Sequence, residues 1–389
     1  MRHLEGKTVV VGVTGSIAAV EVIKLVRALR RSGADIHAVM SHAACRIIHP
    51  HALEYATQNP VITKTTGMVE HVKFCGIGGC ADALLVAPCT ANTISKIANG
   101  IDDTPVTTFA VTAIGSGTPV LVAPAMHEAM FNHPIISQNL AKLRELAHII
   151  EPSIEEDRAK IAESEEIVGA VERVLSKKDL VGKKILVTSG ATVESIDPIR
   201  ILTNRSSGRM GRAIAFEAYR RGAQVTIVHN YDVKGLSQIK IENAGDMIDA
   251  VLEELAKGYD IFVNSAAISD FTVNRVPTKI KSGNDAILEL LTVPKLTKLV
   301  QERYPNLFIV CFKAETNITN DELIKCAQSI DVDIVVANDV TSGGIGTEDN
   351  EIFIINQDVE RYCGVERYCG KKEELAVKIV DAIVKALNK

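Results

Sequence analysis

The sequence predicts an α/β protein made of two doubly wound, Rossmann-like parallel-sheet domains. Three observations carry this prediction: strand-like and helix-like segments alternate, the strand-like runs are apolar throughout, and the pattern starts again near residue 183. Strands that are apolar on both faces are typical of a parallel sheet covered by helices. A chain of 389 residues is also expected to form two or more domains. We place the boundary in the lysine-rich stretch 177–182, giving domains 1–178 and 179–389.

The predicted elements of the N-terminal half begin with a β-branched strand, KTVVVGV at 7–13. A helix follows at 18–33, where apolar residues recur at helical spacing. Further strands are predicted at 35–40, 81–89 and 119–126. In the C-terminal half, strands are predicted at 183–192, 223–230, 260–270, 308–315 and 333–339. Ligands of such folds bind beyond the carboxyl ends of the strands.

Composition excludes several classes of protein. The net charge of −5 argues against nucleic acid as a bulk partner, and no apolar run reaches the roughly 18 residues that span a membrane. The N-terminus resembles a first strand and its turn more than a secretory signal, so we expect a cytoplasmic protein with reduced thiols. The eight cysteines contain no CxxC pair. A tandem hexapeptide, VERYCGVERYCG at 359–370, is interpreted as a duplication that lengthens a surface loop rather than as a metal site.

Two loops are candidates for binding anions. GVTGSIAA (12–19) and TNRSSGRMGRAIA (203–215) each join a strand end to a helix start through glycine and hydroxyl residues. Backbone N–H groups and the helix dipole at such a junction favour a phosphate. The first loop is a weak signal by itself, because any Rossmann-like fold begins in this way.

Four N-terminal motifs carry a resemblance when taken in order. GVTGSIAA, EHVKF (70–74), APCTANTISKIANG (87–100) and PAMHEAMF (124–131) together resemble the homo-oligomeric, flavin-containing cysteine decarboxylases. From the residues alone, His71 is more simply a half-buried histidine. The resemblance instead implies a flavodoxin-like domain in which His71 is catalytic and His127 contacts the substrate carboxylate. It further implies FMN contacts at Gly15, Ser16, Ser41, Thr90, Ala91, Asn92 and Thr107, and flavin sites at subunit interfaces of a homo-oligomer.

The N-terminal half departs from that family at two points. His127 stands where the family has asparagine, although histidine can also donate a hydrogen bond to a carboxylate. The stretch 151–168, which corresponds to a cysteine-containing clamp in the decarboxylases that make pantetheine, has no cysteine. Either another donor serves, such as Cys75 or Cys89, or product formation differs.

The C-terminal half resembles phosphopantothenate–cysteine ligases over nearly all of 183–389. The long segment SGATVESIDPIRILTNRSSGRMGRAIA (189–215) is the most specific, and NSAAISDF, PTKIKS, FKAETN and VANDV follow in order. The fusion of both halves resembles the bifunctional decarboxylase/ligase of coenzyme A synthesis. It implies 4′-phosphopantothenate, cysteine and CTP as substrates, with Mg²⁺ bridging the triphosphate and no protein ligand set for the metal.

The ligase resemblance assigns particular residues. Asn204 would contact the acyl intermediate, Lys279 would neutralise charge on the α-phosphate, and Arg200 is a candidate clamp for phosphate or carboxylate. Two lysines expected before DIVVAND fall at Cys326 and Ile330, so Lys325 or Lys313 could substitute. The remaining predicted substrate and nucleotide contacts are Ser206, Ser207, Gly208, Ala266, Asp270, Pro294 and Phe312.

Three alternative functions compete with this interpretation. The N-terminal half could be a non-catalytic or repurposed flavoprotein attached to a working ligase. A flavin prenyltransferase-like activity would leave the 189–215 segment unexplained. A nicotinamide oxidoreductase would require a GxGxxG loop and a ribose-binding acid, which neither first strand provides. Oligomer size and the choice of CTP over ATP do not follow from the sequence.

Overall fold

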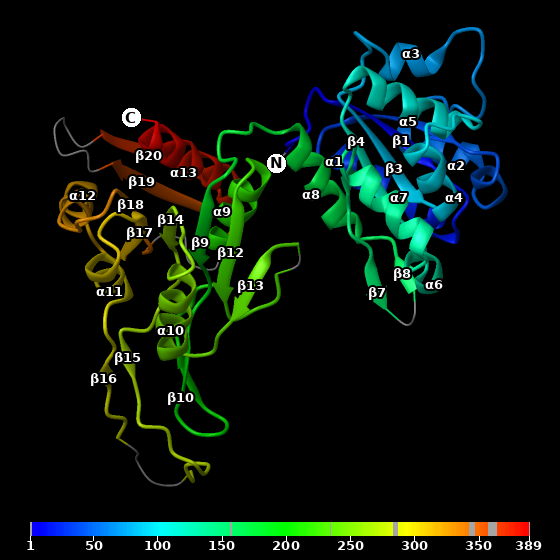
Figure 1. Ribbon diagram of the computed structural model, residues 1–389. Helices are drawn as coiled ribbons and strands as arrows, with labels where there is room; N and C mark the ends of the chain where they lie inside the picture. Colours follow the sequence, from blue (N-terminus) through cyan, green and yellow to red (C-terminus); the bar gives the residue numbers. More distant parts are fainter. Residues whose placement is uncertain are drawn as a thin grey trace. The chain divides into compact units, whose positions relative to one another are not determined.

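The computed structural model describes residues 2–155, 158–233, 235–282, 287–341, 347–356 and 364–388. The chain divides into two compact units, Met1–Ser176 and Lys177–Lys389. Each unit is built around a largely parallel sheet covered by helices, as Figure 1 shows. The predicted α/β class with two doubly wound sheets is therefore confirmed.

Unit 1 contains a five-stranded parallel sheet in the order β2-β1-β3-β4-β6. This order is flavodoxin-like, with the chain reversing its direction across the sheet between β1 and β3. A separate three-stranded antiparallel sheet has the order β5-β8-β7. The strands are β1 (Thr8–Val13), β2 (Asp35–Met40), β3 (Ala83–Cys89), β4 (Val120–Pro124), β5 (Met126–His127), β6 (His148–Ile149), β7 (Ser153–Glu155) and β8 (Arg158–Lys160).

Helices cover both faces of the unit 1 sheet. Successive β1 residues explain why: Val9 and Val11 join one buried cluster, whereas Val10 between them joins the other. The helices are η1 (Ile17–Glu21), α1 (Val22–Arg31), η2 (Ala44–Arg46), α2 (Pro50–Thr57), α3 (Glu70–Cys75), α4 (Ala91–Ala98), α5 (Pro105–Ser116), α6 (Glu128–Phe131), α7 (Pro134–Arg144) and α8 (Ser164–Leu175). Side chains of α1, α2 and α8 pack in the first cluster, and those of α3, α4, α5 and α7 pack in the second.

Unit 2 contains an eight-stranded sheet in the order β13-β12-β9-β14-β17-β18-β19-β20. The first six strands are parallel in the Rossmann order, and the last two are antiparallel to their neighbours. The strands are β9 (Lys184–Thr188), β12 (Gln224–His229), β13 (Ser237–Lys240), β14 (Ile261–Asn264), β17 (Phe308–Glu315), β18 (Ile334–Asp339), β19 (Asp349–Asn356) and β20 (Gly364–Lys371). The pair β19 and β20 was not predicted as part of the sheet.

The tandem hexapeptide corrects one prediction. Its second copy, 365–370, is not part of a surface loop but lies in β20, an edge strand paired along its length with β19. Valine and tyrosine in this copy favour a strand, and pairing with β19 gives their backbone groups hydrogen-bond partners. Most of the first copy lies outside the described residues.

Within the described residues of unit 2, five helices cover the sheet. They are α9 (Arg209–Arg220), α10 (Ala244–Leu255), α11 (Leu296–Arg303), α12 (Asn320–Gln328) and α13 (Lys372–Leu387). Side chains of α9 and α13 pack in the buried cluster that contains Ile185 and Val187 of β9, and those of α10, α11 and α12 pack in the cluster that contains Leu186. The sheet is thus buried on both faces, which explains the continuous apolar strands of the sequence.

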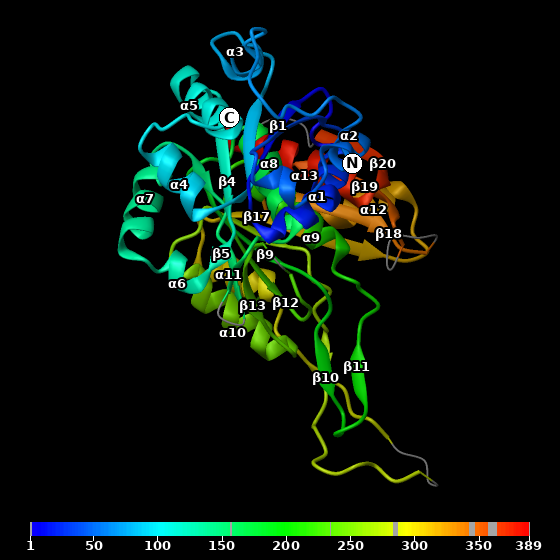
Figure 2. The same cartoon turned by 90° about the vertical axis from the view of Figure 1, so that its right-hand side faces the viewer.

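Two antiparallel pairs extend from the edge of the unit 2 sheet. They are β10 (Val193–Ser195) with β11 (Ile201–Thr203), and β15 (Phe271–Thr272) with β16 (Leu291–Thr292). Figure 2 shows β10 and β11 projecting from the unit beside the segment that follows β15. The backbone N–H of Val276 donates to the carbonyl of Ile196 at 2.8 Å, which ties the two extensions together. Among the described helices, none is both long and apolar enough to cross a membrane.

A buried arginine connects the start of unit 2 to its last helix. Arg221 is only 4% exposed, and its guanidinium donates to Asp179 at 2.8 and 2.5 Å and to Asp381 at 2.6 Å. The hydrogen bond from Arg221 lowers the pKa of Asp179. A carboxyl whose pKa is lowered by folding stabilises the protein above its unfolded pKa, and that stability is lost as the pH falls through the folded value.

We predict that Arg221→Ala lowers the free energy of unfolding of unit 2 by about 2–3 kcal/mol, because it leaves two carboxylates without their cation. The loss should be largest near pH 7 and should shrink below about pH 4, where Asp179 becomes protonated in the unfolded chain. Urea unfolding followed by circular dichroism at pH 7 and at about pH 2.5, well below the unfolded pKa of an aspartate, measures both effects. Asp381→Asn, which removes the more exposed partner, should cost less than about 1 kcal/mol. Equal losses at the two pH values would contradict the linkage to Asp179.

Candidate functional site

Unit 2 has a cavity of about 810 Å³ at the carboxyl ends of its central strands. Its lining includes Asn264 at the end of β14, Phe312 in β17 and Asn338 near the end of β18. It lies beside the boundary between β9 and β14, where the chain reverses direction across the sheet and where ligands of such folds bind. The predicted contacts that line it are Asn204, Ser206, Ser207, Gly208, Ala266, Asp270, Pro294 and Phe312.

The serine–glycine loop forms one wall of this cavity. Gly208 precedes α9 with φ +70°, a left-handed conformation that glycine adopts without strain. Its carbonyl accepts hydrogen bonds from the Ser189 hydroxyl at 2.8 Å and from the Tyr231 hydroxyl at 3.1 Å, and its N–H donates to the Ser206 hydroxyl at 3.4 Å. These hydrogen bonds fix the loop, and the start of α9 faces the cavity. Such an arrangement is suited to binding a phosphate.

A second glycine brings α9 close to the strand ends. A Cβ atom at Gly211 would lie 2.3 Å from the Ser265 hydroxyl oxygen and 2.5 Å from that of Ser189. Any side chain at this position would push the helix away from β9 and β14. The close approach keeps the first turn of α9 over the crevice between those strands.

Three other predicted contacts are held by neighbours. The Asn204 side-chain amide donates to the carbonyl of Ala267 at 3.0 Å, which leaves its side-chain oxygen available. Asp270 pairs with Lys295, the residue that precedes α11. The N–H of Ala266 donates to the Thr188 hydroxyl at 3.3 Å. These bonds set the backbone of 264–270 along one side of the cavity.

Three predicted residues do not line the cavity: Arg200, Lys279 and Lys325. Lys325 is exposed on α12, whereas Lys313, its alternative, does line the cavity and pairs with Glu315 at 2.7 Å. Lys279 is exposed on the segment that follows β15. Their assignments stay predictions.

Asp197 connects Arg200 to the segment that carries Lys279. Its carboxylate is 2% exposed and accepts from the N–H groups of Ile199 and Arg200, both at 2.8 Å, from the Arg200 guanidinium, and from the N–H of Ile280 at 3.1 Å. Arg200 also donates to the carbonyl of Ile280 at 3.2 Å. Burial by itself raises the pKa of Asp197, but these hydrogen bonds outweigh it and hold that pKa far below its usual range.

Sequence reasoning missed part of the cavity's positive charge. Arg205, Arg209, Lys295, Lys298 and Lys372 also line it. Arg205 and Arg209 flank the two serines of the predicted loop, so their presence could have been anticipated from the motif. Lys372 lies more than 150 residues further along the chain, next to the tandem repeat, and nothing in its local sequence indicates a binding role.

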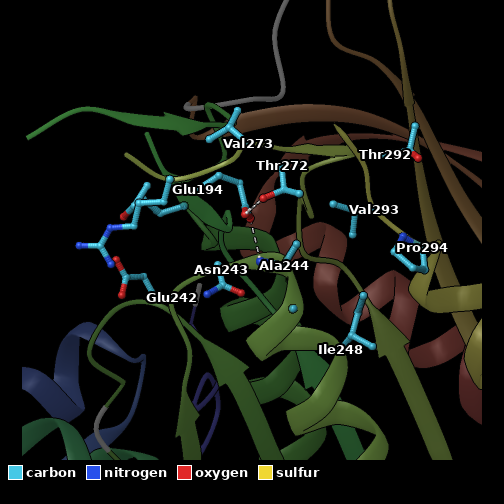
Figure 3. A pocket seen from close by; sticks show the side chains of 14 residues that line it. Glu194, Glu242, Asn243, Ala244, Ile248, Thr272, Val273, Thr292, Val293 and Pro294 are labelled. Carbon is cyan, nitrogen blue, oxygen red and sulfur yellow. Dashed lines mark hydrogen bonds between the residues drawn. The ribbon is translucent and has the colours of Figure 1, made fainter. Parts of the chain in front are cut away.

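A smaller cavity of about 420 Å³ lies against the N-terminus of α10 and shares Pro294 with the first. Figure 3 shows the Glu194 carboxylate between the Thr272 hydroxyl and the backbone of Ala244. Glu194 accepts from the Thr272 hydroxyl at 2.7 Å and from the Ala244 N–H at 2.8 Å. This 5%-exposed carboxylate accepts one hydrogen bond at each oxygen, and it joins β10 to both β15 and α10.

In unit 1, the predicted flavin contacts converge at the carboxyl ends of three adjacent strands. The Thr14 hydroxyl donates to the carbonyl of Pro88 at 2.7 Å and accepts from the N–H of Thr90 at 3.1 Å, and the N–H of Ser41 donates to the carbonyl of Val13 at 3.0 Å. These bonds join the ends of β1, β2 and β3. Gly15 and Ser16 follow β1, Ser41 follows β2, and Thr90, Ala91 and Asn92 follow β3. All six therefore lie at the point where a flavodoxin-like sheet binds its ligand.

Thr107 has a different environment. It is completely buried, and its hydroxyl accepts from the N–H of Thr104 at 2.9 Å in a reciprocal cap at the start of α5. A hydroxyl committed to this cap shapes the helix N-terminus and is poorly placed to bind a ligand directly.

His71 is a half-buried histidine with one ring nitrogen that lacks a hydrogen-bond partner among the described residues. It lies on α3, and its ring is 6.4 Å from that of Phe109, centroid to centroid. Its Nδ1 is buried and has no hydrogen-bond partner among the described residues. An unpaired buried polar atom is costly, so an additional group that bonds Nδ1 would fit here.

His127 lies beside the stretch that corresponds to the clamp. Its Nδ1 accepts from the N–H of Ala129 at 3.2 Å, so the neutral ring carries its proton on Nε2, where it can be donated outward. β5, which contains His127, pairs with β8, and the register sets His127 opposite Arg158. The cysteine-free stretch 151–168 thus contributes the antiparallel strands β7 and β8 next to the predicted substrate-binding strand.

The two cysteines considered as replacement donors are both buried. Burial raises the pKa of Cys75 to about 12 and raises that of Cys89 as well. Thiols of such weak acidity are poor proton donors and poor nucleophiles. Within the described parts of the chain, no group of three or more histidine, cysteine or acidic side chains could hold a metal ion.

Comparison with known proteins finds matching families for both halves of the chain and relatives that match its whole length. The Flavoprotein family matches residues 1–176, and the family of the DNA/pantothenate metabolism flavoprotein C-terminal domain matches residues 180–387. The coenzyme A biosynthesis bifunctional protein CoaBC of Thermococcus kodakarensis is 49% identical over 99% of this chain and 97% of its own length. That of Methanocaldococcus jannaschii is 36% identical over 98% of this chain and 94% of its own. A crystal structure of the C-terminal domain of a CoaBC protein matches with a TM-score of 0.45 and 28% identity, covering 55% of this chain and 99% of that one.

Both halves are matched in one continuous alignment, in the order that the sequence motifs predict. The chain therefore belongs to the family of bifunctional coenzyme A biosynthesis proteins CoaBC.

Proposed function

We propose that this protein joins 4′-phosphopantothenate to cysteine in unit 2 and decarboxylates the product in unit 1 to give 4′-phosphopantetheine. The observation that carries the proposal is the unit 2 cavity, in which a serine–glycine loop, a helix N-terminus and several cations surround one crevice. Such a site suits a substrate rich in phosphate. The alignment of both halves with CoaBC proteins supports coupling this activity to a flavoprotein partner domain.

Ligation begins with activation of a carboxylate. An oxygen of the phosphopantothenate carboxylate attacks the α-phosphorus of CTP, and pyrophosphate leaves. The amine of cysteine then attacks the acyl carbon, and CMP leaves. In this scheme the loop at Ser206 and Ser207 holds phosphate, Asn204 holds the acyl nucleotide, and Lys279 offsets charge on the α-phosphate. Ala266, Asp270 and Phe312 would surround the nucleoside, and Mg²⁺ bound with the triphosphate would neutralise part of its charge with few ligands from the protein.

Decarboxylation depends on FMN, which when bound supplies the two-electron oxidation of the cysteinyl thiol and the later return of those electrons. Loop residues 15–16 and 90–92 would hold its phosphate and ring at the strand ends. His71, with its unpaired Nδ1, would accept or donate the proton of the reacting cysteinyl group. His127 would orient the carboxylate through Nε2–H.

Exposed apolar side chains support the predicted homo-oligomer with flavin sites at subunit interfaces. Met68, Val69, Val72 and Ile77 surround α3 and leave much of their surface uncovered. They neighbour His71 in sequence, so a second subunit that covered them would also close the site around its ring. Oligomer and cytoplasmic location both stay predictions.

One observation favours a second candidate function. The clamp stretch has no cysteine, and the pKa values of Cys75 and Cys89 are raised by burial. If no other group replaces the clamp cysteine, unit 1 would be a repurposed or inactive flavoprotein attached to a working ligase.

A single reaction separates the two candidates. Purified protein is incubated with FMN, CTP, Mg²⁺, cysteine and 4′-phosphopantothenate, and products are identified by mass spectrometry. Accumulation of 4′-phosphopantetheine supports both activities, whereas accumulation of phosphopantothenoylcysteine alone supports the ligase with an inactive unit 1. Absence of product with CTP and with ATP would overturn the ligase proposal.

Separate active sites predict that two variants have opposite effects. Lys279→Ala should slow ligation by about 100-fold, because charge on the α-phosphate loses its partner, and should leave decarboxylation of supplied phosphopantothenoylcysteine unchanged. His71→Asn should abolish carbon dioxide release and leave ligation unchanged. Both reactions are followed by mass spectrometry of the same folded preparations. Loss of both activities in either folded variant would contradict two independent sites.

Asp197 is expected to act as a positioning residue for Lys279 through Ile280. Asp197→Asn loses one accepting oxygen, so the segment 276–282 should be misplaced and kcat for ligation should fall by about tenfold, with the Kd for CTP unchanged. In a Lys279→Ala background the same change should cost nothing further, because both act through one group. Asp249→Asn, at an exposed acid on α10, serves as the control. Equal loss with and without Lys279 would show that Asp197 acts independently of Lys279, either through Arg200 or on folding.

A further inference from the structure

The topology of the unit 2 sheet brings Lys372 to the nucleotide cavity. β19 runs antiparallel to β18, and β20 runs antiparallel to β19, so β20 has the same direction as the parallel strands. The carboxyl end of β20 therefore lies at the same edge of the sheet as the ends of β9, β14, β17 and β18. Lys372 follows β20 directly, as the first residue of α13, and its side chain lines the cavity.

Lys372 is buried without a counter-ion. It is 7% exposed, and no acidic oxygen pairs with its ammonium group among the residues that the structure describes. The other lysines of the cavity do have acidic partners: Lys295 pairs with Asp270, Lys313 with Glu315 at 2.7 Å, and Lys298 with Glu302 at 4.0 Å. The charge of Lys372 is thus the one among these four that the protein itself leaves uncompensated.

A second cation makes this arrangement less favourable still. Burial lowers the pKa of Lys372, and the nearby charge of Arg209 lowers it further. Arg209 is the first residue of α9, at the start of the helix that follows the serine–glycine loop. Two cations close together, one of them buried, destabilise a folded protein unless an anion joins them.

We propose that Lys372, together with Arg209, binds the polyphosphate chain of the nucleotide in unit 2. This inference rests on the proposed ligase function. Lys372 and Arg209 would contact the β- and γ-phosphates, whereas the reaction takes place at the α-phosphate. Phosphate oxygens would give Lys372 the charge-assisted hydrogen bonds that it lacks in the unliganded protein. The buried position makes the interaction stronger than the same contact at an exposed site.

The environment of residues 326 and 330 agrees with this assignment. The ligase resemblance expects lysines there, but the chain has Cys326 and Ile330. Ile330 lines the cavity with an apolar side chain, and Cys326 is exposed outside the lining. Position 330 therefore supplies no cation to the cavity, whereas Lys372 at the start of α13 does.

The test compares Lys372→Met with Lys371→Met. Both variants lose one positive charge from adjacent positions, but Lys371 is exposed and does not line the cavity. Isothermal titration calorimetry measures Kd for CTP, CMP and inorganic tripolyphosphate. Lys372→Met should weaken CTP and tripolyphosphate by about 10- to 100-fold and leave CMP nearly unchanged, because only the β- and γ-phosphates lose a partner. Lys371→Met should bind all three as the unchanged protein does, and Lys372→Arg should retain most of the CTP affinity.

Thermal unfolding without ligand separates binding from a structural role. Lys372→Met removes a buried, unpaired charge, so its Tm should equal or exceed that of the unchanged protein. A lower Tm together with unchanged CTP affinity would overturn the proposal, as would equal weakening of CTP and CMP. If the protein bound tripolyphosphate through Lys372 but neither CTP nor ATP, the proposed ligase function would fail and the polyphosphate site would stand. If it bound none of these ligands, both would fail.

Discussion

Both units depend on the same constraint, which is a switch point in the sheet. There, two parallel strands lie side by side, and the strands that follow each of them are added on opposite sides. At that point the connecting helices leave toward opposite faces, so the strand ends open onto a crevice with free N–H groups. In unit 1 the crevice lies between β1 and β3, and the Thr14 hydroxyl bonds both strand ends. In unit 2 it lies between β9 and β14, and Gly211 lets α9 approach both strands closely. The chemistry proposed for each unit follows from what its loops add to this crevice.

Two buried carboxylates fix the positions of segments that lie outside the unit 2 sheet. Glu194 holds β10 against β15 and α10, and Asp197 holds the turn after β10 against the backbone of Ile280. The segment that carries Lys279 has no strand pairing of its own in the described residues. Its position therefore depends on these hydrogen bonds, and the proposed charge stabilisation at the α-phosphate depends on them in turn.

The cations of the unit 2 cavity fall into two groups, one that stabilises the unliganded protein and one that is available to a bound anion. Most of its lysines are neutralised by acids of the protein, which stabilises the unliganded fold. Lys372 and Arg209 leave positive charge uncompensated, and this costs stability until a polyanion binds. Functional sites commonly retain such unfavourable groups, because the free energy released on neutralising them contributes to affinity.

The sequence by itself determined the two α/β halves, the approximate strand positions and the serine–glycine loop around Ser206. These features are local: apolar runs, helical periodicity and glycine–serine turns act over a few residues. Only the tertiary structure decided that Asp197 reaches Ile280, 83 residues away, that the antiparallel pair of β7 and β8 lies beside His127, and that the second VERYCG copy is an edge strand leading to Lys372. Each of these depends on pairing between distant segments, and local propensity cannot specify a partner or a register across such separations.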